Sequence, residues 1–325
     1  MAEKRRAPIE SPARIAIFAP SPVLTVTIET SGSSDDDIHL HAGGQGVWVG
    51  RMAALLGAEV TLCSALGGEA GCVLEALIRS QGQLVRPVPA VAPNGAYLHD
   101  RRGGKRKLIA TVRSPVLKRH EIDQLYGAMT VAALASDVAV LTCTEDARVL
   151  AGDHYRRLAA DLRRNEVPVI ADLTGDALQA ALAGGVSVLK LSHEELAKIA
   201  SQPLDSPLRF AAEISLLVEG GADNVVISRA SEPAIASIDS SLFELRGPTF
   251  EPLDHQGAGD SMVAALAVGM ARGLDVPEAL KMAVAAGALN VTRHGLGSGA
   301  RGDIEQLAGA VKVQPLHEIV DKLNA

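Results

Sequence analysis

The sequence predicts an α/β protein with a mostly parallel central sheet, helices on both of its faces and a small second β-sheet. Along most of the 325 residues, short β-rich runs alternate with Ala-rich stretches of helical length. A hydrophobic content of 47% is enough for one large α/β core or two modest domains. Two further intervals break the alternation and have the pattern of β-hairpins.

The alternating elements can be placed along the chain by composition. Strands are expected at 14–18, 60–64, 138–143, 167–172, 187–190 and 224–228. Helices are expected at 46–56, 71–81, 153–164, 194–199, 208–219 and 276–293. A helix that connects two strands returns the chain to the end of the sheet at which the first strand began. The second strand then runs in the same direction as the first, so this order predicts parallel pairing.

The two hairpin intervals are 23–40 and 95–112, and the second contains a Gly103-Gly104 turn. We expect them to form a small β lid. The division of the chain is then a flexible tail at 1–13, an α/β core at 14–22, 41–93 and 114–325, and the lid at 23–40 and 94–113. An uncovered sheet edge invites pairing, so a homodimer through the lid is expected.

Composition excludes several classes of function. A net charge of -7 and an aromatic content of 2% argue against general nucleic-acid binding. No apolar run approaches the length of a membrane span. Pro20 and Pro22 interrupt the apolar stretch that follows the basic start, so no signal-peptide core is expected. Cys63, Cys72 and Cys143 lack the spacing of a zinc site or a disulfide framework, which indicates reduced thiols in a cytoplasmic protein.

A basic segment lies in the second hairpin. Its turn carries Arg101, Arg102, Lys105, Arg106 and Lys107. In a net-acidic protein these charges can attract a phosphorylated substrate, although a solvated hairpin tip is the simpler interpretation. Arg113, at the return of the hairpin, is a second candidate phosphate ligand because its planar fork matches a phosphate group.

The strongest motif is the segment 254–261, Asp-His-Gln-Gly-Ala-Gly-Asp-Ser, followed by an apolar run of helical length. Gly257 and Gly259 flank Ala258 and allow a tight turn that approaches a ligand closely. The first free amides of the helix and its dipole suit a phosphate oxygen. Asp260 in the first turn is then placed to take a proton from a substrate hydroxyl, which is a phosphoryl-transfer geometry.

This helix start allows two interpretations. A carboxylate in the first turn is expected to stay ionised at neutral pH and to act as a base. Alternatively, Asp260 merely caps the helix and the glycines form an ordinary turn. Under either interpretation, Gly273 ends the helix.

Two separated segments carry a family resemblance. Residues 257–263 resemble the C-terminal signature of the ribokinase-like, or PfkB, sugar kinases. Residues 42–51, Ala-Gly-Gly-Gln-Gly-Val-Trp-Val-Gly-Arg, resemble the family's N-terminal sugar-binding signature, about two hundred residues earlier. The likeness runs from about residue 15 to about residue 299, and residues 19–22 and 42–46 look most like the phosphofructokinase branch. It implies a ribokinase-like three-layer sandwich whose β lid covers the sugar site.

The resemblance also implies an activity. It indicates a kinase that uses ATP and Mg²⁺ to phosphorylate a hydroxyl of a sugar or sugar phosphate, with Asp260 as base and the amides of Gly257, Ala258 and Gly259 as the anion hole. On the nucleotide side it implies Lys190 and Ser192 near the phosphates and Glu195 at the magnesium ion. Ser192 stands where the family has an asparagine. The same resemblance assigns Ser228 and Asn290 to the borders of the nucleotide pocket.

The sugar side departs from the family pattern. The resemblance implies a substrate site that contains Thr25, Gly43, Gly44, Gln45, Trp48 and Asp254. Gln45 replaces a lysine, Trp48 an asparagine, and Thr25 an aspartate of the phosphofructokinase branch. Since an indole cannot reproduce the paired donor and acceptor of an amide, either the ligand differs or the site is filled.

Three hypotheses from different classes follow. A sugar or sugar-phosphate kinase is favoured, with a nucleoside as another possible acceptor. A non-catalytic ligand-binding or regulatory protein on the same fold is the alternative, because a fold alone does not secure activity. A nicotinamide-dependent dehydrogenase is disfavoured, since the glycines at 44–50 lack the dinucleotide spacing, and no Walker A motif occurs.

Overall fold

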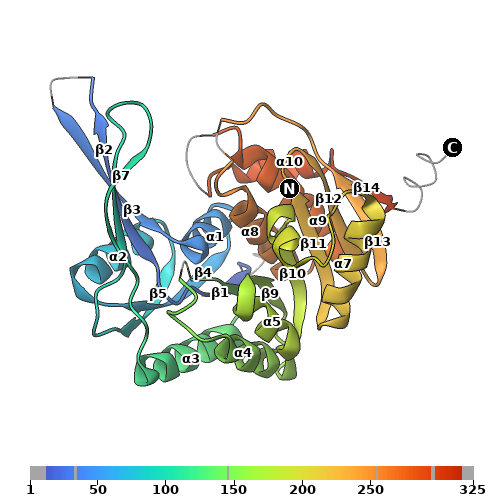
Figure 1. Cartoon of the computed structure of the whole chain (residues 1–325), viewed down its shortest axis with the longest axis horizontal. Coiled ribbons are helices and arrows are strands. Elements are labelled where there is room, and N and C mark those ends of the chain that lie inside the picture. The colour runs from blue at the N-terminus through green and yellow to red at the C-terminus, as the bar shows by residue number, and fades with distance from the viewer. Residues whose placement is uncertain (1–11, 33–34, 145, 254, 294–296, 317–325) are drawn as a thin grey trace, which may run out of the picture.

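The structure is a computed structural model that describes residues 12–32, 35–144, 146–253, 255–293 and 297–316. The large sheet contains β1 (Arg14–Phe18), β4 (Glu59–Leu66), β5 (Leu84–Pro89), β8 (Val138–Thr142), β9 (Val169–Asp172), β10 (Val186–Ser192), β11 (Ala222–Arg229), β12 (Glu232–Ile238), β13 (Ser241–Arg246) and β14 (Lys312–Pro315). Their order is β14-β13-β12-β11-β10-β9-β8-β1-β4-β5 (Figure 1). Pairing is parallel from β5 to β11 and antiparallel from β11 to β14.

Helices cover both faces of this sheet. One face packs against α1 (Gln45–Leu55), α2 (Gly68–Ser80), α8 (Ala258–Ala271), α9 (Val276–Asn290) and α10 (Arg301–Ala308). The other packs against α3 (Arg119–Leu134), α4 (Gly152–Arg164), α5 (Gly175–Gly184), α6 (His193–Ile199) and α7 (Pro207–Glu219). The result is the three-layer α/β sandwich expected from the sequence.

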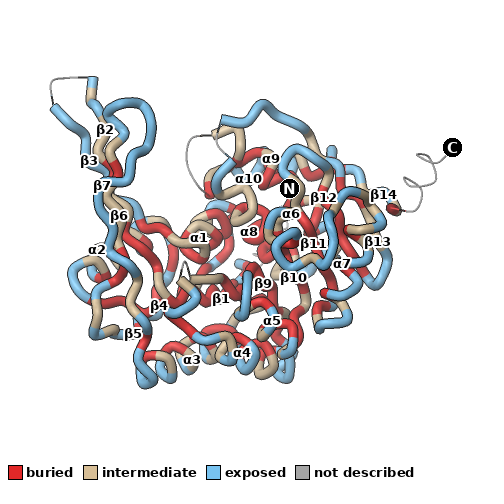
Figure 2. The backbone as a smooth tube through the Cα atoms, viewed as in Figure 1, coloured by how far each residue is buried: buried red, intermediate tan, exposed pale blue. Residues whose placement is uncertain are grey.

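The alternation of side chains along the strands builds the two hydrophobic cores. In β1, Ile15 and Ile17 join the core under α1 and α8, whereas Ala16 and Phe18 join the core under α3 and α4. Helices cover both faces of the sheet, so the central strands β1, β8 and β9 are buried along almost their whole length (Figure 2). Helix α8 is buried from Ser261 to Gly269 because it lies between the sheet and its neighbouring helices.

A separate small sheet confirms the two predicted hairpins. It consists of β2 (Val23–Thr30), β3 (Asp36–Gly43), β6 (Ala96–Asp100) and β7 (Lys107–Val112), in the order β3-β2-β6-β7. Figure 1 shows it projecting from the large sheet beside α1 and α2. Strand β3 continues past the predicted boundary at residue 40 and ends at Gly43, directly before α1.

Several elements were not predicted. β5 contains Pro87 and Pro89, and prolines argue against a strand when only the sequence is known. The strand lies at the edge of the sheet, where the missing backbone N–H donors are tolerated. The β12–β13 turn places Asp239 and Ser240 at positive φ without a glycine, so its hairpin lacked the usual sequence signal. Helices α3, α5 and α10 and strand β14 were also missed, and the helix expected at 276–293 ends at Asn290.

Ala13 is held against the start of β4. Its carbonyl accepts a hydrogen bond from the amide of Glu59 at 2.8 Å. Residues 1–11 of the expected tail lie outside the described residues. Among the helices described, none is long and apolar enough to cross a membrane.

Gly46 lets the start of α1 approach the ends of β1 and β8. A Cβ there would lie 2.5 Å from the Cβ of Ala19 and 2.9 Å from Oγ1 of Thr142. We expect Gly46→Ala to lower the free energy of unfolding by about 1–3 kcal/mol. Gly127→Ala is the matched control, because it lies within α3 with nothing within 4 Å of its new methyl and should add about 1 kcal/mol. Denaturant unfolding of both variants measures the contrast, and equal effects would contradict this packing.

Candidate active site

The site is built around the first turn of α8. Gly257 is the N-cap of this helix, with φ of 77°, a left-handed conformation that glycine adopts without strain. It has no side chain to accept hydrogen bonds from the first-turn amides of Ala258, Gly259 and Asp260. The first hydrogen bond of the helix, from the amide of Ser261 to the carbonyl of Gly257, is 2.9 Å long. Within the described residues no side chain of the N-cap bonds these amides, and the turn presents them beside a carboxylate.

Lys190 lies directly against this turn. A Cβ added to Gly259 would be 2.5 Å from Nζ of Lys190, so glycine is required for the ammonium to sit there. Lys190 comes from β10, and its Nζ donates to both carboxylate oxygens of Asp172 at 3.5 Å. Asp172 ends the adjacent strand β9. Both side chains are buried, with 7% and 1% of their surfaces exposed.

Four charges thus meet at the carboxyl ends of the parallel strands. Burial alone would lower the pKa of Lys190, but Asp172, Glu195 and Asp260 together raise it above its ordinary value. The ammonium therefore stays protonated at neutral pH. Burial also raises the pKa of Asp172, an effect that Lys190 opposes.

The protonation of Asp260 differs from the sequence expectation. Burial, followed by the charge of Asp172, raises its pKa from the ordinary 3.8 to about 7, while Lys190 pulls it down and Glu195 pushes it up. The carboxyl group is therefore only partly ionised at neutral pH. Its position in the first turn of a helix had predicted that it would be fully ionised. A pKa near the working pH is the value that a general base needs.

Glu195 and Ser192 form a capping box at the start of α6. Oε2 of Glu195 accepts from the amide of Ser192 at 2.7 Å, and the Ser192 hydroxyl accepts from the amide of Glu195 at 3.2 Å. Glu195 also lines the large cavity described below. Among the described residues no cluster of three His, Cys, Asp or Glu side chains is placed to hold a metal ion.

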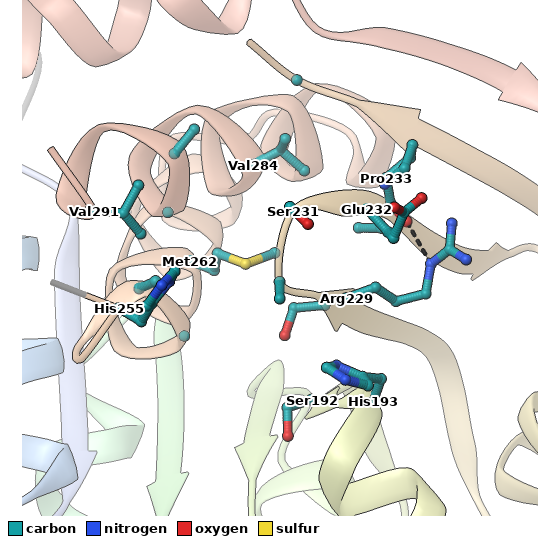
Figure 3. Close-up of a pocket in the computed structure, with 18 of the residues that line it drawn as sticks. Ser192, His193, Arg229, Ser231, Glu232, Pro233, His255, Met262, Val284 and Val291 are labelled. Atoms are coloured by element: carbon teal, nitrogen blue, oxygen red, sulfur yellow. Dashed lines mark hydrogen bonds between the residues drawn. The ribbon is translucent and has the colours of Figure 1, made fainter. Parts of the chain in front are cut away.

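A cavity of about 620 Å³ opens beside α8, a size typical of small-molecule sites. Figure 3 shows Val284 of α9 and Val291, directly after that helix, along one side. Ser231 to Pro233 of the β11–β12 hairpin lie opposite, and Ser192 and His193 lie at the start of α6. The guanidinium of Arg229 turns away and donates from Nε to the carbonyl of Pro233 at 2.6 Å (Figure 3). The wall formed by α9 is therefore apolar, whereas the β11–β12 hairpin and the start of α6 contribute polar and charged side chains.

Most of the residues predicted on the nucleotide side line this cavity, and one of them, Asn290, instead holds the loop beside it. Lys190, Ser192, Glu195 and Ser228 line the cavity, as does His255. Asn290 does not line it. It is buried at 1% exposure, where its amide donates to the carbonyl of Gln256 at 2.8 Å and its oxygen contacts the Ser261 hydroxyl at 3.1 Å. Asn290 therefore holds the glycine loop, and other residues of α9 form the wall.

The predicted sugar-side residues meet at the start of α1. A Cβ on Gly43 would lie 3.3 Å from Oγ1 of Thr25, so β2 and β3 bring these two together. Gly44 caps α1 with φ of 107°. Gln45 accepts from the amide of Cys143 at 2.9 Å and hydrogen-bonds Asp172, which links α1 to the charged cluster. Trp48 is partly buried on the same helix, one turn later.

Two predicted substrate residues stand apart. Arg113 is exposed beyond β7 and does not line the cavity. Hydrogen bonds from Arg148 are the main cause of the lowered pKa of Asp146, and the charge of Arg113 adds a small effect, so Arg113 lies near Asp146. Asp254 lies outside the described residues.

Sequence reasoning missed Asp172 and the apolar wall of the cavity. Asp172 ended a predicted strand, and an acidic residue at the carboxyl end of a buried strand was an available signal. The wall residues Val284, Gly287 and Val291 have no such signal, because an Ala- and Val-rich helix is also what a plain core requires.

A model of the pfkB family of carbohydrate kinases matches residues 22–301. The chain belongs to this family. It is therefore a carbohydrate kinase, a phosphotransferase whose acceptor is an alcohol group, and kinase chemistry implies ATP as its phosphoryl donor.

Curated relatives support the assignment. The ATP-dependent 6-phosphofructokinase isozyme 2 of Mycobacterium tuberculosis is 30% identical over 266 residues, which are 81% of this chain and 78% of that protein. The 1-phosphofructokinase of Vibrio cholerae is 27% identical over 289 residues, 86% of this chain and 87% of the relative.

Solved structures confirm the ribokinase-like fold of this PfkB kinase. Phosphofructokinase-2 from Escherichia coli in complex with potassium superposes with a TM-score of 0.80 at 22% identity, covering 92% of this chain and 99% of that one. Arabidopsis thaliana ribokinase with ribose and ATP gives a TM-score of 0.70 at 20% identity, with 92% and 99% covered. At these identities the likeness concerns the fold.

The raised pKa of Asp260 predicts a pH-dependent stability difference. Between about pH 4 and pH 7 the folded protein binds the Asp260 proton and the unfolded chain does not, so this group makes stability fall as pH rises. Asp260→Asn removes that loss. We expect its melting temperature to exceed that of the parent more at pH 8 than at pH 5.

The control is Asp153→Asn, which makes the same change in the exposed first turn of α4. It should show no such trend with pH. The raised pKa of Asp260 would be contradicted if the difference in melting temperature between Asp260→Asn and the parent stayed constant or shrank from pH 5 to pH 8.

Proposed function

We propose that this PfkB kinase transfers the γ-phosphate of Mg·ATP to a hydroxyl of a sugar or sugar phosphate, with fructose 6-phosphate and fructose 1-phosphate as the first acceptors to test. The observation that carries the proposal is the first turn of α8, where Asp260, with a pKa of about 7, lies beside open amides and the ammonium of Lys190. The choice of acceptors follows the printed names of the relatives.

The residues divide the reaction between them. Asp260 accepts the proton of the attacking hydroxyl, which typically contributes about 10²- to 10⁴-fold in rate. The amides of Gly257, Ala258 and Gly259 and the ammonium of Lys190 stabilise negative charge on the transferred group. Each such donor is worth roughly 3 kcal/mol in comparable sites. Because these groups are fixed by α8 and β10, they need little reorganisation during the transfer.

The nucleotide is assigned to the large cavity. Its apolar wall on α9 suits one face of a base, and Lys190, Ser192 and Glu195 line the part of the cavity assigned to the phosphates. Glu195 would hold Mg²⁺ together with phosphate oxygens, and the ion would neutralise charge on the phosphates. The capping box fixes the direction of the Glu195 carboxylate towards this part of the cavity.

A non-catalytic binding protein is the second candidate, and the replaced sugar-side residues favour it. Gln45, Trp48 and Thr25 depart from the family pattern. Against it, a binding protein has no use for a partly buried carboxylate whose pKa is raised to about 7 at an anion site. The kinase is therefore the better supported function.

We further propose that two copies pair through the small sheet. Its edge strand β7 is exposed along its whole length, and Ile38 and Leu108 are 63% and 51% exposed. Cytoplasmic location is proposed from the free cysteines Cys63, Cys72 and Cys143.

Loss of the Asp260 carboxylate tests the reaction. We expect Asp260→Asn to lower kcat by about 10²- to 10⁴-fold while the Kd for ATP changes little, because the amide cannot take the proton. ADP release from Mg·ATP is measured across a panel of sugars, sugar phosphates and nucleosides, with Asp153→Asn as control. Asp260→Asn as active as the parent would sink the assignment of the base. Absence of turnover with every acceptor, although ATP binds, would favour the binding protein.

The pH profile provides a separate test. Only the carboxylate form of Asp260 can accept a proton, so kcat/KM for the acceptor should fall about tenfold for each pH unit below about 7 and level off above it. Steady-state rates from pH 5.5 to 8.5 at saturating Mg·ATP give this curve. A flat profile with an unchanged rate at pH 5.5 would contradict a base with this pKa.

A further inference from the structure

Arg229 is the last residue of β11, and its side chain turns away from the cavity that its backbone helps to line (Figure 3). Only 16% of this side chain is exposed. A guanidinium loses hydration when it is buried, so proteins seldom bury one without partners. The mechanism proposed above does not use this charge, and its burial calls for another explanation.

Three elements hold the guanidinium. Nε donates to the carbonyl of Pro233 at 2.6 Å, and Nη2 lies 3.7 Å from Oε2 of Glu244 in β13. The group also lies over the ring of Phe210 in α7, 5.3 Å from its centroid, which is a cation–π contact. Burial lowers the pKa of Arg229, and the charges of Glu244 and Glu232 oppose this effect. The side chain therefore ties the β11–β12 hairpin to α7 and β13.

The ladder between β11 and β12 is interrupted at this point. Ile227 pairs with Ile235, but Arg229 pairs with Glu232, so two steps along β11 face three steps along β12. Such a β-bulge leaves one residue out of the ladder. Pro233 lies in this stretch and has no N–H to donate, and its carbonyl accepts from the Arg229 side chain. Arg229 thus supplies a cross-strand hydrogen bond where the backbone ladder is broken.

The turn of the hairpin has an unfavourable backbone conformation. Ala230 and Ser231 connect the two strands, and φ of Ala230 is 50°. This left-handed conformation suits Gly, Asn or Asp in a two-residue turn, and alanine adopts it at a cost in free energy. Within the described residues, the side chains of Ser231 and Glu232 are exposed and form no hydrogen bond or ion pair. We call residues 230–233 the hairpin tip, and Arg229 is the polar side chain that anchors it.

The hairpin tip forms one side of the cavity assigned to the nucleotide. Residues 228–234 all line this cavity, and Figure 3 shows Ser231 and Pro233 opposite Val284 of α9. Helix α9 is buried along most of its length, which fixes its position. The hairpin tip is exposed and has no such support. The width of the cavity therefore depends on the hairpin tip, whose position depends on Arg229.

A direct contact with the phosphates is the other role that an arginine beside a nucleotide can have. The geometry favours the supporting role. Nε of Arg229 is bonded to Pro233, and the ring of Phe210 covers one face of the guanidinium. If the group swung into the cavity, the buried Glu244 would retain only its contact with the exposed Arg246, at 2.9 Å. Arg229 therefore acts from behind the wall of the cavity.

We propose that Arg229 is a positioning residue for the phosphoryl donor, because it holds the hairpin tip in the place where the tip closes the nucleotide cavity. The inference rests on the proposed function, which assigns the nucleotide to this cavity. Arg229 itself touches neither substrate. Without the guanidinium the hairpin tip would be free to move, and a nucleotide would have to order it on binding, so affinity would fall.

Two measurements on the full chain test this role. The Kd for Mg·ADP is measured by calorimetry without an acceptor, and hydrogen exchange is followed in peptides that cover residues 228–236. Arg229→Gln removes the charge and the fork, whereas Arg229→Lys keeps a charge beside Glu244 but has one ammonium for two partners. Arg163→Gln is the matched control, because Arg163 pairs with Asp223 at the opposite end of β11, at 2.9 Å. Melting temperatures confirm that each variant is folded.

We expect Arg229→Gln to raise the Kd for Mg·ADP and KM for ATP about tenfold or more, with faster exchange in residues 228–236. Arg229→Lys should raise both constants about threefold or more, and it decides the test if Arg229→Gln does not fold. At saturating ATP, kcat and KM for the acceptor should stay within about twofold, because the first turn of α8 is unchanged. Arg163→Gln should change every value by less than about twofold, as expected for an exposed ion pair.

Three results would overturn the inference. One is an unchanged Kd for Mg·ADP in the folded variants of Arg229. Another is a raised Kd without faster exchange in residues 228–236, which would make Arg229 a direct ligand of the nucleotide. The third is an equal rise of KM for the acceptor, which would indicate a general loss of structure. Failure of the kinase function is seen separately, because the Kd for Mg·ADP and the exchange would respond to Arg229 although no acceptor gives ADP release.

Discussion

The ammonium of Lys190 is the contact on which the architecture of the site depends. It lies buried between the Asp172 carboxylate and the first turn of α8, and it has room there because residue 259 is glycine. A buried charge without a partner is costly, so the side chain of Lys190 requires Asp172, and each carboxylate nearby requires Lys190. Removing either partner would strand the other in the core. The ion pair therefore ties the ends of β9 and β10 to the start of α8.

This contact also sets the chemistry of Asp260. Three carboxylates, those of Asp172, Glu195 and Asp260, surround one ammonium, so negative charge is in excess. Burial and the nearby Asp172 then raise the proton affinity of Asp260 until its pKa is about 7. The same excess makes the site receptive to a divalent cation, which the phosphates of a nucleotide would bring. The crowding of carboxylates therefore costs folding stability and also raises the pKa of Asp260 to a value suited to a general base.

The parts of this picture that the sequence predicted are those governed by local rules. Alternating strands and helices predicted the parallel sheet, and the glycines around Ala258 predicted the helix start with Asp260 in its first turn. The raised pKa of Asp260 could not be predicted, because it arises from burial and then from Asp172, and both depend on how the fold packs segments that are distant in sequence. The helix dipole, a local effect, suggested the opposite direction.

Asn290 shows the same limit in another form. Its helix was placed correctly at the cavity, but the side chain that lines a cavity depends on the rotation of the helix about its axis. Gly287 sets that rotation by allowing α9 to approach Met262 and the carbonyl of Ala258 closely, and Asn290 then turns inward to hold Gln256. Periodicity gives a buried face without saying which neighbour it faces.

The two halves of the site use different materials, and this difference bears on how an acceptor is recognised. The donor half consists of backbone amides, a buried ion pair and an apolar wall, all of which depend on the packing of α8, α9 and β10. The proposed acceptor half lies at the start of α1 and on the small sheet, whose core contribution is confined to one face. Side chains on the other face of that sheet can therefore change without disturbing the core, whereas Lys190 is held by its buried ion pair with Asp172. Gln45 joins the halves, because it hydrogen-bonds Asp172 at the buried end of the cluster and begins the helix that carries Trp48 and Arg51. Because Gln45 is neutral where the family pattern that it resembles has a lysine, Lys190 is the ammonium that balances Asp172 in this cluster.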